Sequence, residues 1–249
     1  MVSRALEGVF RALRGAHGAD ASRDAMDVLF RRFVEPGDLV FDGGALAGDG
    51  ISSFRRLGAR VIAIEPQSLF VDALAHIHGR DPLVVLAPRA LSETTGRIVL
   101  RLNGDHPAFS TLSDAFVARA ATIPDWDGLT WDESVDVEAV TLDALIARYG
   151  MPTFIRVRAV GYEDAVLRGL SHPVNALSFN FIAIMRDIAA ASLERLSLLG
   201  DYRYNMSIGE NHTLAFDQWI SVSEMVGHLF NLPRDVTSGD IYAALAAHR

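Results

Sequence analysis

The sequence predicts an α/β protein with a mostly parallel, seven-stranded β-sheet, for three reasons. From residue 38 onward, short apolar runs alternate with helical patterns, which is typical of a parallel sheet covered by helices on both faces. The 249 residues, of which 50% are hydrophobic, suffice for one substantial core. Near the end of the chain the pattern changes to two strands around a turn, which predicts a terminal antiparallel hairpin.

Two helical patterns precede the sheet. Residues 1–17 place apolar side chains near one helical face, and a second pattern runs from Ser22 to about Val34. We expect residues 1–35 to form N-terminal helices packed on the core and residues 36–249 to form the main domain. The apolar face of the first helix could also support a homodimer.

Apolar runs mark the expected strands. They occupy residues 38–44, 60–66, 83–91, 97–102, 135–142, 153–159 and 176–184. The final pair of strands is expected within residues 201–216, around Gly209, and two short helical patterns follow it. The longest irregular insertion runs from about Asn103 to Ser134, and an insertion of this kind beside a sheet often forms a lid or a substrate wall.

Composition excludes several function classes. Lys and Arg number 23 against 31 Asp and Glu, and the resulting net charge of -8 repels nucleic acid phosphates and anionic lipid surfaces. The chain has no cysteine, which excludes disulfides and thiolate metal sites. No apolar stretch has the length of a membrane span. We expect a cytoplasmic protein without a nucleic acid partner or a membrane span.

Metal-binding patterns are also missing. His76 and His78 are two residues apart and would point to different sides of a helix. The acidic run around Trp126 and Trp131 lacks the glycine and the terminal glutamate of a calcium loop. We therefore expect no metal site.

A glycine-rich turn follows the first expected strand. The segment VFDGGALAGDGISSF places Asp42 at the strand end, and Gly44, Gly48 and Gly50 before a helix. Small residues let a backbone approach a ligand, and a helix N-terminus offers free N–H donors. The segment lacks the G-x-G-x-x-G spacing of dinucleotide sites. Taken alone, it is equally compatible with a turn that binds no ligand.

The second expected strand, RVIAIEP, strengthens the case for a ligand. It ends on Glu65, roughly twenty residues after the turn, which is the placement from which a carboxylate accepts ribose hydroxyls. Pro66 follows and can begin the next helix. Together the two strand ends favour a cofactor that contains adenosine.

Four segments together resemble the FkbM family of S-adenosylmethionine-dependent methyltransferases. They are FDGGALAGDGISSFRRLGARVIAIEP, APRALSETTGRIVL, VDVEAVTLDALIARYG and FIRVRAVGYEDAVLRGL, within about residues 36–185. The resemblance implies a class I methyltransferase (Rossmann-like) fold and S-adenosyl-L-methionine as the cofactor. It also implies methyl transfer to a hydroxyl oxygen of a saccharide or a small natural product.

The resemblance further implies a cofactor site along three segments. The methionine part would lie against the first turn, the ribose at the end of the second strand, and the adenine beside the third segment. The residues carried over are, in that order, Asp42, Gly44, Ala45 and Gly48, then Glu65 and Pro66, then Ala90 and Ser92. Ser110 and Thr111 resemble a small polar segment of the family near the acceptor, and are candidate substrate contacts only.

FIRVRAVGYE departs from the family pattern inside the expected cleft. Where the family usually has Asp-Val-Glu-Gly-x-Glu, this chain keeps the glycine and the final Glu163, while Arg158 replaces the Asp and Val160 the first Glu. The usual Asn of the first turn and Glu of a later strand are replaced by Leu46 and Asn180. Glu163 and Arg158 are therefore the candidate catalytic residues.

Arg158 allows three interpretations, because an arginine is always protonated and the cofactor carries a sulfonium cation. Its guanidinium could pair with Asp42 or Glu65 in the cofactor site, bind an anionic group of substrate or cofactor, or face solvent. The methyltransferase activity could accordingly be impaired. The alternative is a decayed or engineered, non-catalytic copy of the fold that acts as a binding or scaffold protein.

Overall fold

The computed structural model describes residues 20–126 and 128–246. The helix and the dimer surface predicted within residues 1–17 lie outside the described residues. The main sheet has seven strands in the order β3-β2-β1-β7-β8-β10-β9. Its strands are β1 (Leu39–Gly43), β2 (Arg60–Ile64), β3 (Val84–Ala87), β7 (Phe154–Val157), β8 (Ala176–Ile182), β9 (Tyr202–Ile208) and β10 (Ser238–Leu245).

The strand directions confirm the predicted fold class. The pairings of β1 with β2, β2 with β3, β1 with β7 and β7 with β8 are parallel, whereas β10 is antiparallel to both β8 and β9. A mostly parallel sheet with this order and an antiparallel strand inserted near one edge is the class I methyltransferase, Rossmann-like arrangement. The order reverses between β1 and β7, which makes that junction the topological switch point.

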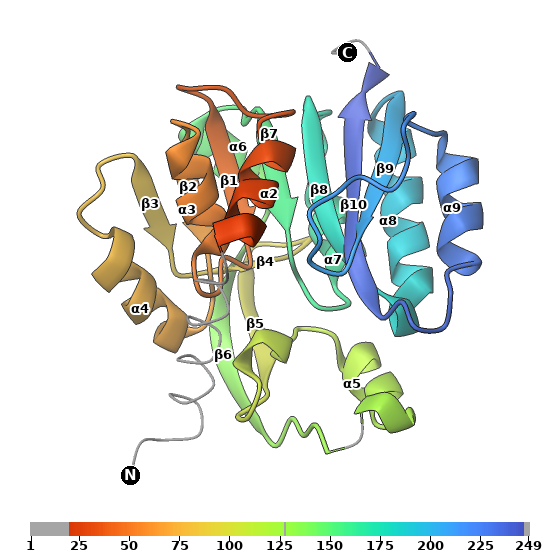
Figure 1. Cartoon of the computed structure of the whole chain (residues 1–249). Helices are drawn as coiled ribbons and strands as arrows, with labels where there is room; N and C mark the ends of the chain where they lie inside the picture. Colours follow the sequence, from red (N-terminus) through yellow and green to blue (C-terminus); the bar gives the residue numbers. More distant parts are fainter. Residues whose placement is uncertain (1–19, 127, 247–249) are drawn as a thin grey trace.

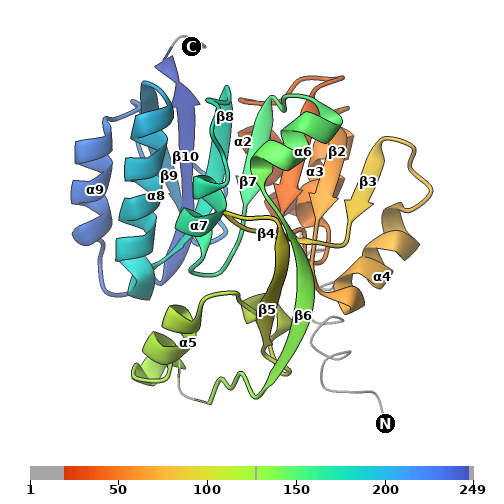
Figure 2. The same ribbon diagram turned by 180° about the vertical axis from the view of Figure 1, so that it is seen from behind.

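Helices cover both faces of the main sheet. Figure 1 shows α2 (Asp20–Phe30) and α3 (Asp49–Arg56) in front of the sheet, with α4 (Ser68–His78) beside β3. The opposite face, seen in Figure 2, carries the remaining helices of the main layer. These are α6 (Leu142–Tyr149), α7 (Glu163–Arg168), α8 (Arg186–Leu199) and α9 (Val222–Phe230).

Each face has its own hydrophobic core because side chains alternate along the strands. The α6–α9 face buries Phe41, Ile155 and Phe179, among others. The α2–α3 face buries Val40, Phe154 and neighbours from the helices. Strands that are apolar on both faces belong in the middle of a covered parallel sheet, as the sequence predicted.

Two predicted strands lie outside the main sheet. β5 (Gly96–Leu102) and β6 (Glu133–Val140) pair with each other in antiparallel fashion and, with β4 (Ala90–Leu91), form a separate three-stranded sheet. Figures 1 and 2 show this small sheet beyond the end to which β1, β2 and β7 point. The predicted insertion is the connection between its two long strands. It contains η1 (Pro107–Phe109), α5 (Asp114–Ala120) and η2 (Pro124–Trp126).

The position predicted for the terminal hairpin was wrong in its second strand. β9 ends at Ile208, and the strand that pairs with it is β10, which follows α9. His212 adopts a left-handed backbone with φ 52°, so the chain leaves the sheet where a return strand was expected. The sequence of β10 contains Ala and Leu, which favour helices, so it resembles a helix. The strand is almost entirely buried between β8 and β9, and this tertiary packing overrides the helix propensity.

A buried ion pair joins β1, β7 and α3 on the α2–α3 face. The register aligns Asp42 with Arg156, and Nη1 of Arg156 lies 3.2 Å from Oδ1 of Asp42. Asp42 is 0% exposed and Arg156 is 2% exposed. Nη2 of Arg156 also lies 3.4 Å from Oδ2 of Asp49, in the first turn of α3. A Cβ on Gly50 would overlap the Arg156 guanidinium, so only glycine lets α3 pack on the pair.

The buried pair gives a stability prediction. Arg156→Met should lower the free energy of unfolding by about 3–5 kcal/mol, because Asp42 is then left buried without its countercharge. Adding Asp42→Asn to that variant should restore part of the loss, since the uncompensated charge disappears. Urea unfolding followed by circular dichroism measures both. A double variant that is no more stable than Arg156→Met would contradict the prediction.

Candidate functional site

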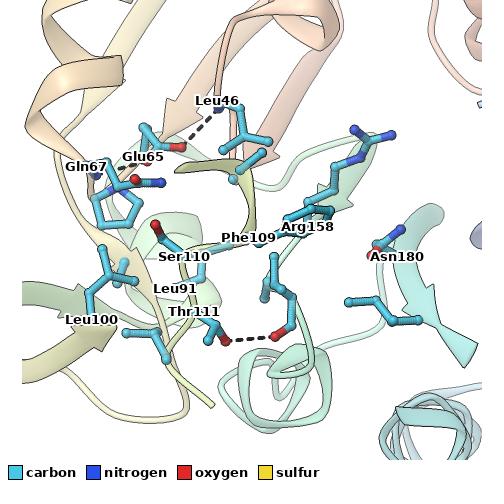
Figure 3. Close-up of a pocket in the computed structure, with 18 of the residues that line it drawn as sticks. Leu46, Glu65, Gln67, Leu91, Leu100, Phe109, Ser110, Thr111, Arg158 and Asn180 are labelled. Carbon is cyan, nitrogen blue, oxygen red and sulfur yellow. Dashed lines mark hydrogen bonds between the residues drawn. The ribbon is translucent and has the colours of Figure 1, made fainter. Parts of the chain in front are cut away.

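A cavity of about 490 Å³ opens where β1, β2 and β7 end, between the main sheet and the small sheet. Its size lies within the range of small-molecule sites. Most of the wall is apolar, and Figure 3 shows that Glu65 and Asn180 stand on opposite sides of it. In open α/β sheets, ligands bind at this edge next to the switch point. The cavity is therefore the candidate site of the fold.

Glu65 fixes the turn that follows β1. Its Oε2 accepts a hydrogen bond from the backbone N–H of Leu46 at 3.0 Å, and its Oε1 accepts from the N–H of Gln67 at 2.9 Å (Figure 3). Leu46 has a left-handed φ of 46°, which is unusual for leucine. Burial raises the pKa of Glu65 to about 7, despite the two backbone donors. The carboxylate thus holds a strained turn against the cavity wall.

Glu163 fixes the turn that follows β7 in the same manner. Its Oε1 accepts from the N–H of Ala159 at 3.1 Å, and its Oε2 accepts from the N–H of Gly161 at 3.0 Å. Between them Val160 has φ 49°, a costly conformation for a β-branched residue. Glu163 is 2% exposed, and burial raises its pKa to about 7. Its carboxylate faces its own turn, whereas Val160 faces the cavity.

Backbone strain is concentrated around the cavity. Within residues 20–126 and 128–246, the non-glycine residues with positive φ are Leu46, Val160 and His212. The first two line the cavity, and His212 lies in the loop after β9. Strained backbone persists only where the surroundings hold it in place, and it often accompanies function. The two turns are therefore preorganised parts of the site.

Arg158 follows the last residue of β7 and contributes to the cavity wall. Its Nη2 lies 3.5 Å from Oδ2 of Asp240 on β10, and its side chain is 17% exposed. Pairing with Asp42 or Glu65, one of the three interpretations, is not what the structure shows. Asp42 is held by Arg156, and Glu65 by two backbone donors.

Charges gather beneath the cavity on the α2–α3 face, because β1, β7 and β10 carry polar residues at their adjoining ends. Burial is the main cause that lowers the pKa of His212, and Arg156 and Arg158 act in the same direction. Burial also raises the pKa of Asp42, and Arg156 offsets only part of this effect. His212 is accordingly neutral at physiological pH, and Arg156 and Arg158 carry the positive charge.

The predicted site residues fall into two groups. Gly44, Glu65, Pro66, Ala90 and Arg158 line the cavity. The others support it from behind, and they are Asp42, Ala45, Gly48, Ser92 and Glu163.

The supporting residues act through packing. A Cβ on Gly48 would crowd Leu74 and His78, so this glycine allows close packing of the turn on α4. The Ser92 hydroxyl lies 3.4 Å from the Tyr162 hydroxyl and is buried. These positions shape the site without facing the cavity.

The insertion between β5 and β6 forms the cavity wall that the sequence predicted in general terms. Phe109, Trp126 and Leu129 line the cavity, and the rings of Phe109 and Trp126 lie 5.3 Å apart in an edge-on arrangement. Ser110 and Thr111 line it as well. Sequence reasoning did not single out the aromatic residues, although two tryptophans and two phenylalanines in a polar insertion were the available signal.

Two hydrogen bonds attach this insertion to the segments that follow β7 and β2. Thr111 Oγ1 donates to the carbonyl oxygen of Val160 at 2.7 Å (Figure 3), and Gln67 Nε2 donates to the carbonyl oxygen of Pro107 at 3.1 Å. The insertion is thus tied to the ends of both β2 and β7. Its apolar side chains form part of the cavity wall.

No helix in the described part of the chain is long and apolar enough to cross a membrane. No group of three or more His, Cys, Asp or Glu side chains in these residues has the geometry to hold a metal ion.

Comparison with known proteins identifies no family. No family model matches the sequence, and no curated protein matches it. The resemblance to the FkbM family therefore remains a prediction.

Solved structures give matches of low similarity. Precorrin-6Y C5,15-methyltransferase from Geobacter metallireducens has 11% identity and a TM-score of 0.46, over 90% of this chain and 87% of that one. An S-adenosylmethionine-dependent O-methyltransferase from Thermotoga maritima has 13% identity and a TM-score of 0.44, over 91% and 66%. Fibrillarin from Aeropyrum pernix, with bound S-adenosyl-L-methionine, has 10% identity and a TM-score of 0.45, over 90% and 76%. Because these identities and TM-scores are low, the fold is assigned from the strand order of this chain and not from the matches.

The Glu163 clamp gives a pH prediction. A folded-state pKa near 7, above the ordinary 4.5, means that the stability contributed by this group is present below pH 4.5 and lost as the pH rises through 7. At pH 5 the buried carboxyl group is protonated, and both of its oxygens can still accept an N–H, whereas the amide nitrogen of Glu163→Gln cannot. The substitution should therefore lower the free energy of unfolding by about 1–3 kcal/mol at pH 5. The difference between parent and variant should shrink towards pH 8.

Urea unfolding at pH 5, 6, 7 and 8 measures the difference in free energy of unfolding between the parent and Glu163→Gln. The contributions of other titrating groups are common to both proteins and cancel in this difference. Glu194→Gln is the matched control, because Glu194 is exposed on α8. It should show no pH-dependent difference from the parent. A Glu163→Gln penalty that grows with pH would contradict the prediction.

Proposed function

We propose that this chain binds S-adenosyl-L-methionine and transfers its methyl group to a small molecule held in the cavity. The observation that carries the proposal is the position of Glu65. Its carboxylate stands at the end of β2, on the cavity wall, beside the glycine-rich turn at the switch point. From that position a carboxylate accepts ribose hydroxyls.

The residues around Glu65 fit the adenosine part of the cofactor. Each oxygen of Glu65 accepts one backbone N–H and keeps a second lone pair for a ribose hydroxyl. Ala90 and Leu91 provide an apolar wall suited to adenine, and Pro66 continues that surface. Gly44 brings the backbone of the first turn to the cavity without a side chain. These residues would hold the nucleoside half.

The bound cofactor supplies an electrophilic methyl group, and the residues of this chain provide position and a dry environment. Methyl transfer requires mainly proximity and an in-line approach of the acceptor. The insertion that carries Phe109, Trp126 and Leu129 contributes these apolar side chains to the cavity wall. We assign the acceptor atom to oxygen, in keeping with the FkbM resemblance.

Arg158 supports a second candidate function, a non-catalytic binding or scaffold protein on the same fold. A like charge about 5 Å from a sulfonium, at an effective dielectric near 20, costs roughly 3 kcal/mol, or on the order of a hundredfold in affinity. Arg158 lines the cavity, and Val160 replaces a carboxylate of the family signature. Failure to bind the cofactor would favour this candidate.

Calorimetric titration with S-adenosyl-L-methionine and with S-adenosylhomocysteine tests the proposal. We expect micromolar binding of both. Glu65→Gln should weaken binding roughly 10- to 100-fold, because it replaces a charged acceptor of ribose hydroxyls. The exposed Glu194→Gln should bind like the parent. Circular dichroism of each variant checks that it is folded.

Two outcomes would contradict the proposal. If neither ligand binds up to millimolar concentration, the chain has a methyltransferase fold but does not bind the cofactor. Equal binding by the parent and a folded Glu65→Gln variant would show that the nucleoside does not lie on Glu65.

A further inference from the structure

We infer that Arg158 binds a carboxylate on the acceptor, and that the substrate is a carboxylic acid with an apolar body, methylated on its carboxylate. This inference rests on the proposed methyltransferase function and deepens it. It replaces the saccharide expected from the FkbM resemblance with a different substrate class.

The first observation is that Arg158 is poorly satisfied for a partly buried cation. Its Nε is buried and has no hydrogen-bond acceptor among the described residues. Within the described part of the chain its one ion pair, to Oδ2 of Asp240, is long at 3.5 Å, and Oδ1 of Asp240 has no hydrogen-bond partner there. A guanidinium has five N–H donors in a planar fork that matches a carboxylate. Arg158 thus has N–H donors at the cavity wall that are not fully used within the protein.

The second observation is that polar residues lie beside Arg158 in a cavity whose lining is mostly apolar. Asn180 stands on the same side as Arg158, opposite Glu65 (Figure 3). The β8–β10 register places Asn180 next to Asp240, and Ser238 further along β10 also lines the cavity. Phe109, Trp126 and other apolar side chains also line the cavity. An apolar body with one anionic end fits this lining better than a saccharide.

The third observation concerns the base that a hydroxyl acceptor would need. The acidic side chains that line the cavity are Glu65 and Glu210. Glu65 is on the side opposite Arg158 and already accepts two backbone N–H groups, and Glu210 is exposed in the loop after β9. A carboxylate acceptor needs neither of them, because a carboxylic acid with an ordinary pKa near 4 is already ionised at neutral pH.

A carboxylate also resolves the charge conflict that Arg158 creates. A negative group between the guanidinium and the sulfonium turns a repulsion between two cations into two attractions. One carboxylate oxygen forms the new carbon–oxygen bond with its own lone pair, while the electrons of the carbon–sulfur bond remain on sulfur. The products are a methyl ester and S-adenosylhomocysteine, and no proton has to leave.

The test uses the chain saturated with S-adenosylhomocysteine. Phenylacetate, 3-phenylpropionate and 4-hydroxybenzoate are titrated calorimetrically, each beside its amide. We expect at least one acid to bind roughly 10- to 100-fold more tightly than its amide. Arg158→Gln should abolish this preference. Asp240→Asn should keep it, because Arg158 loses only its intramolecular partner. If Arg158 had a purely structural role, neither variant would change the ratio of acid to amide affinity.

A separate arm asks whether Arg158 binds the carboxylate of the cofactor instead. S-Adenosylhomocysteine carries that group, and 5′-methylthioadenosine lacks it. If Arg158→Gln weakens S-adenosylhomocysteine tenfold or more but leaves 5′-methylthioadenosine unchanged, the inference is overturned. Equal, small effects on the two nucleosides support it.

The same experiments separate this inference from the proposed function. The inference is overturned, while the proposed function stands, if the acids bind no better than their amides. The same conclusion follows if no acid binds at 10 mM to the chain saturated with S-adenosylhomocysteine. If the parent does not bind S-adenosylhomocysteine, both the inference and the proposed function are overturned.

Product analysis adds a direct test of the methylated atom. With S-adenosyl-L-methionine present, mass spectrometry should find an alkali-labile methyl ester. An alkali-stable methyl ether of 4-hydroxybenzoate would contradict the inference.

Discussion

Two buried glutamates, each accepting two backbone N–H groups, are the constraint on which the site depends. Glu65 holds the turn after β1 and Glu163 holds the turn after β7. Both turns contain a non-glycine residue in the left-handed region, at Leu46 and Val160, and such residues cost of order 1–3 kcal/mol each. The backbone hydrogen bonds to both carboxyl groups offset that cost. The cavity therefore exists in one shape before any ligand arrives, which lowers the ordering cost of binding.

The two turns are coupled to the rest of the molecule from both sides. Below them, the buried pair of Asp42 and Arg156 joins β1 to β7 and fixes α3 through Asp49. Above them, one hydrogen bond from Thr111 ties the insertion to the turn after β7, and another from Gln67 ties it to the end of β2. On the proposed function, this one junction of the sheet would place the nucleoside beside Glu65 and the acceptor beside Arg158.

Much of this arrangement could be predicted from sequence, and the failures have physical causes. The alternation of apolar runs with helical patterns predicted the main sheet, but it could not separate strands that pair locally in the small sheet from those of the core. Arg156 was overlooked although a charge inside a buried strand requires a partner, and Asp42 was the obvious candidate. Glu163 was predicted as a catalytic residue. Its place on the turn after β7 depends on the backbone path, which the residues themselves do not reveal.

The most direct test of the central claim is a crystal structure of the chain with S-adenosylhomocysteine at saturating concentration. The account predicts nucleoside density in the cavity, with the ribose hydroxyls within hydrogen-bond distance of Glu65 and the adenine against Ala90 and Leu91. The turns at Leu46 and Val160 should keep their left-handed conformations, since they are held before binding. An empty cavity, or a nucleoside bound elsewhere without contact to Glu65, would contradict the account.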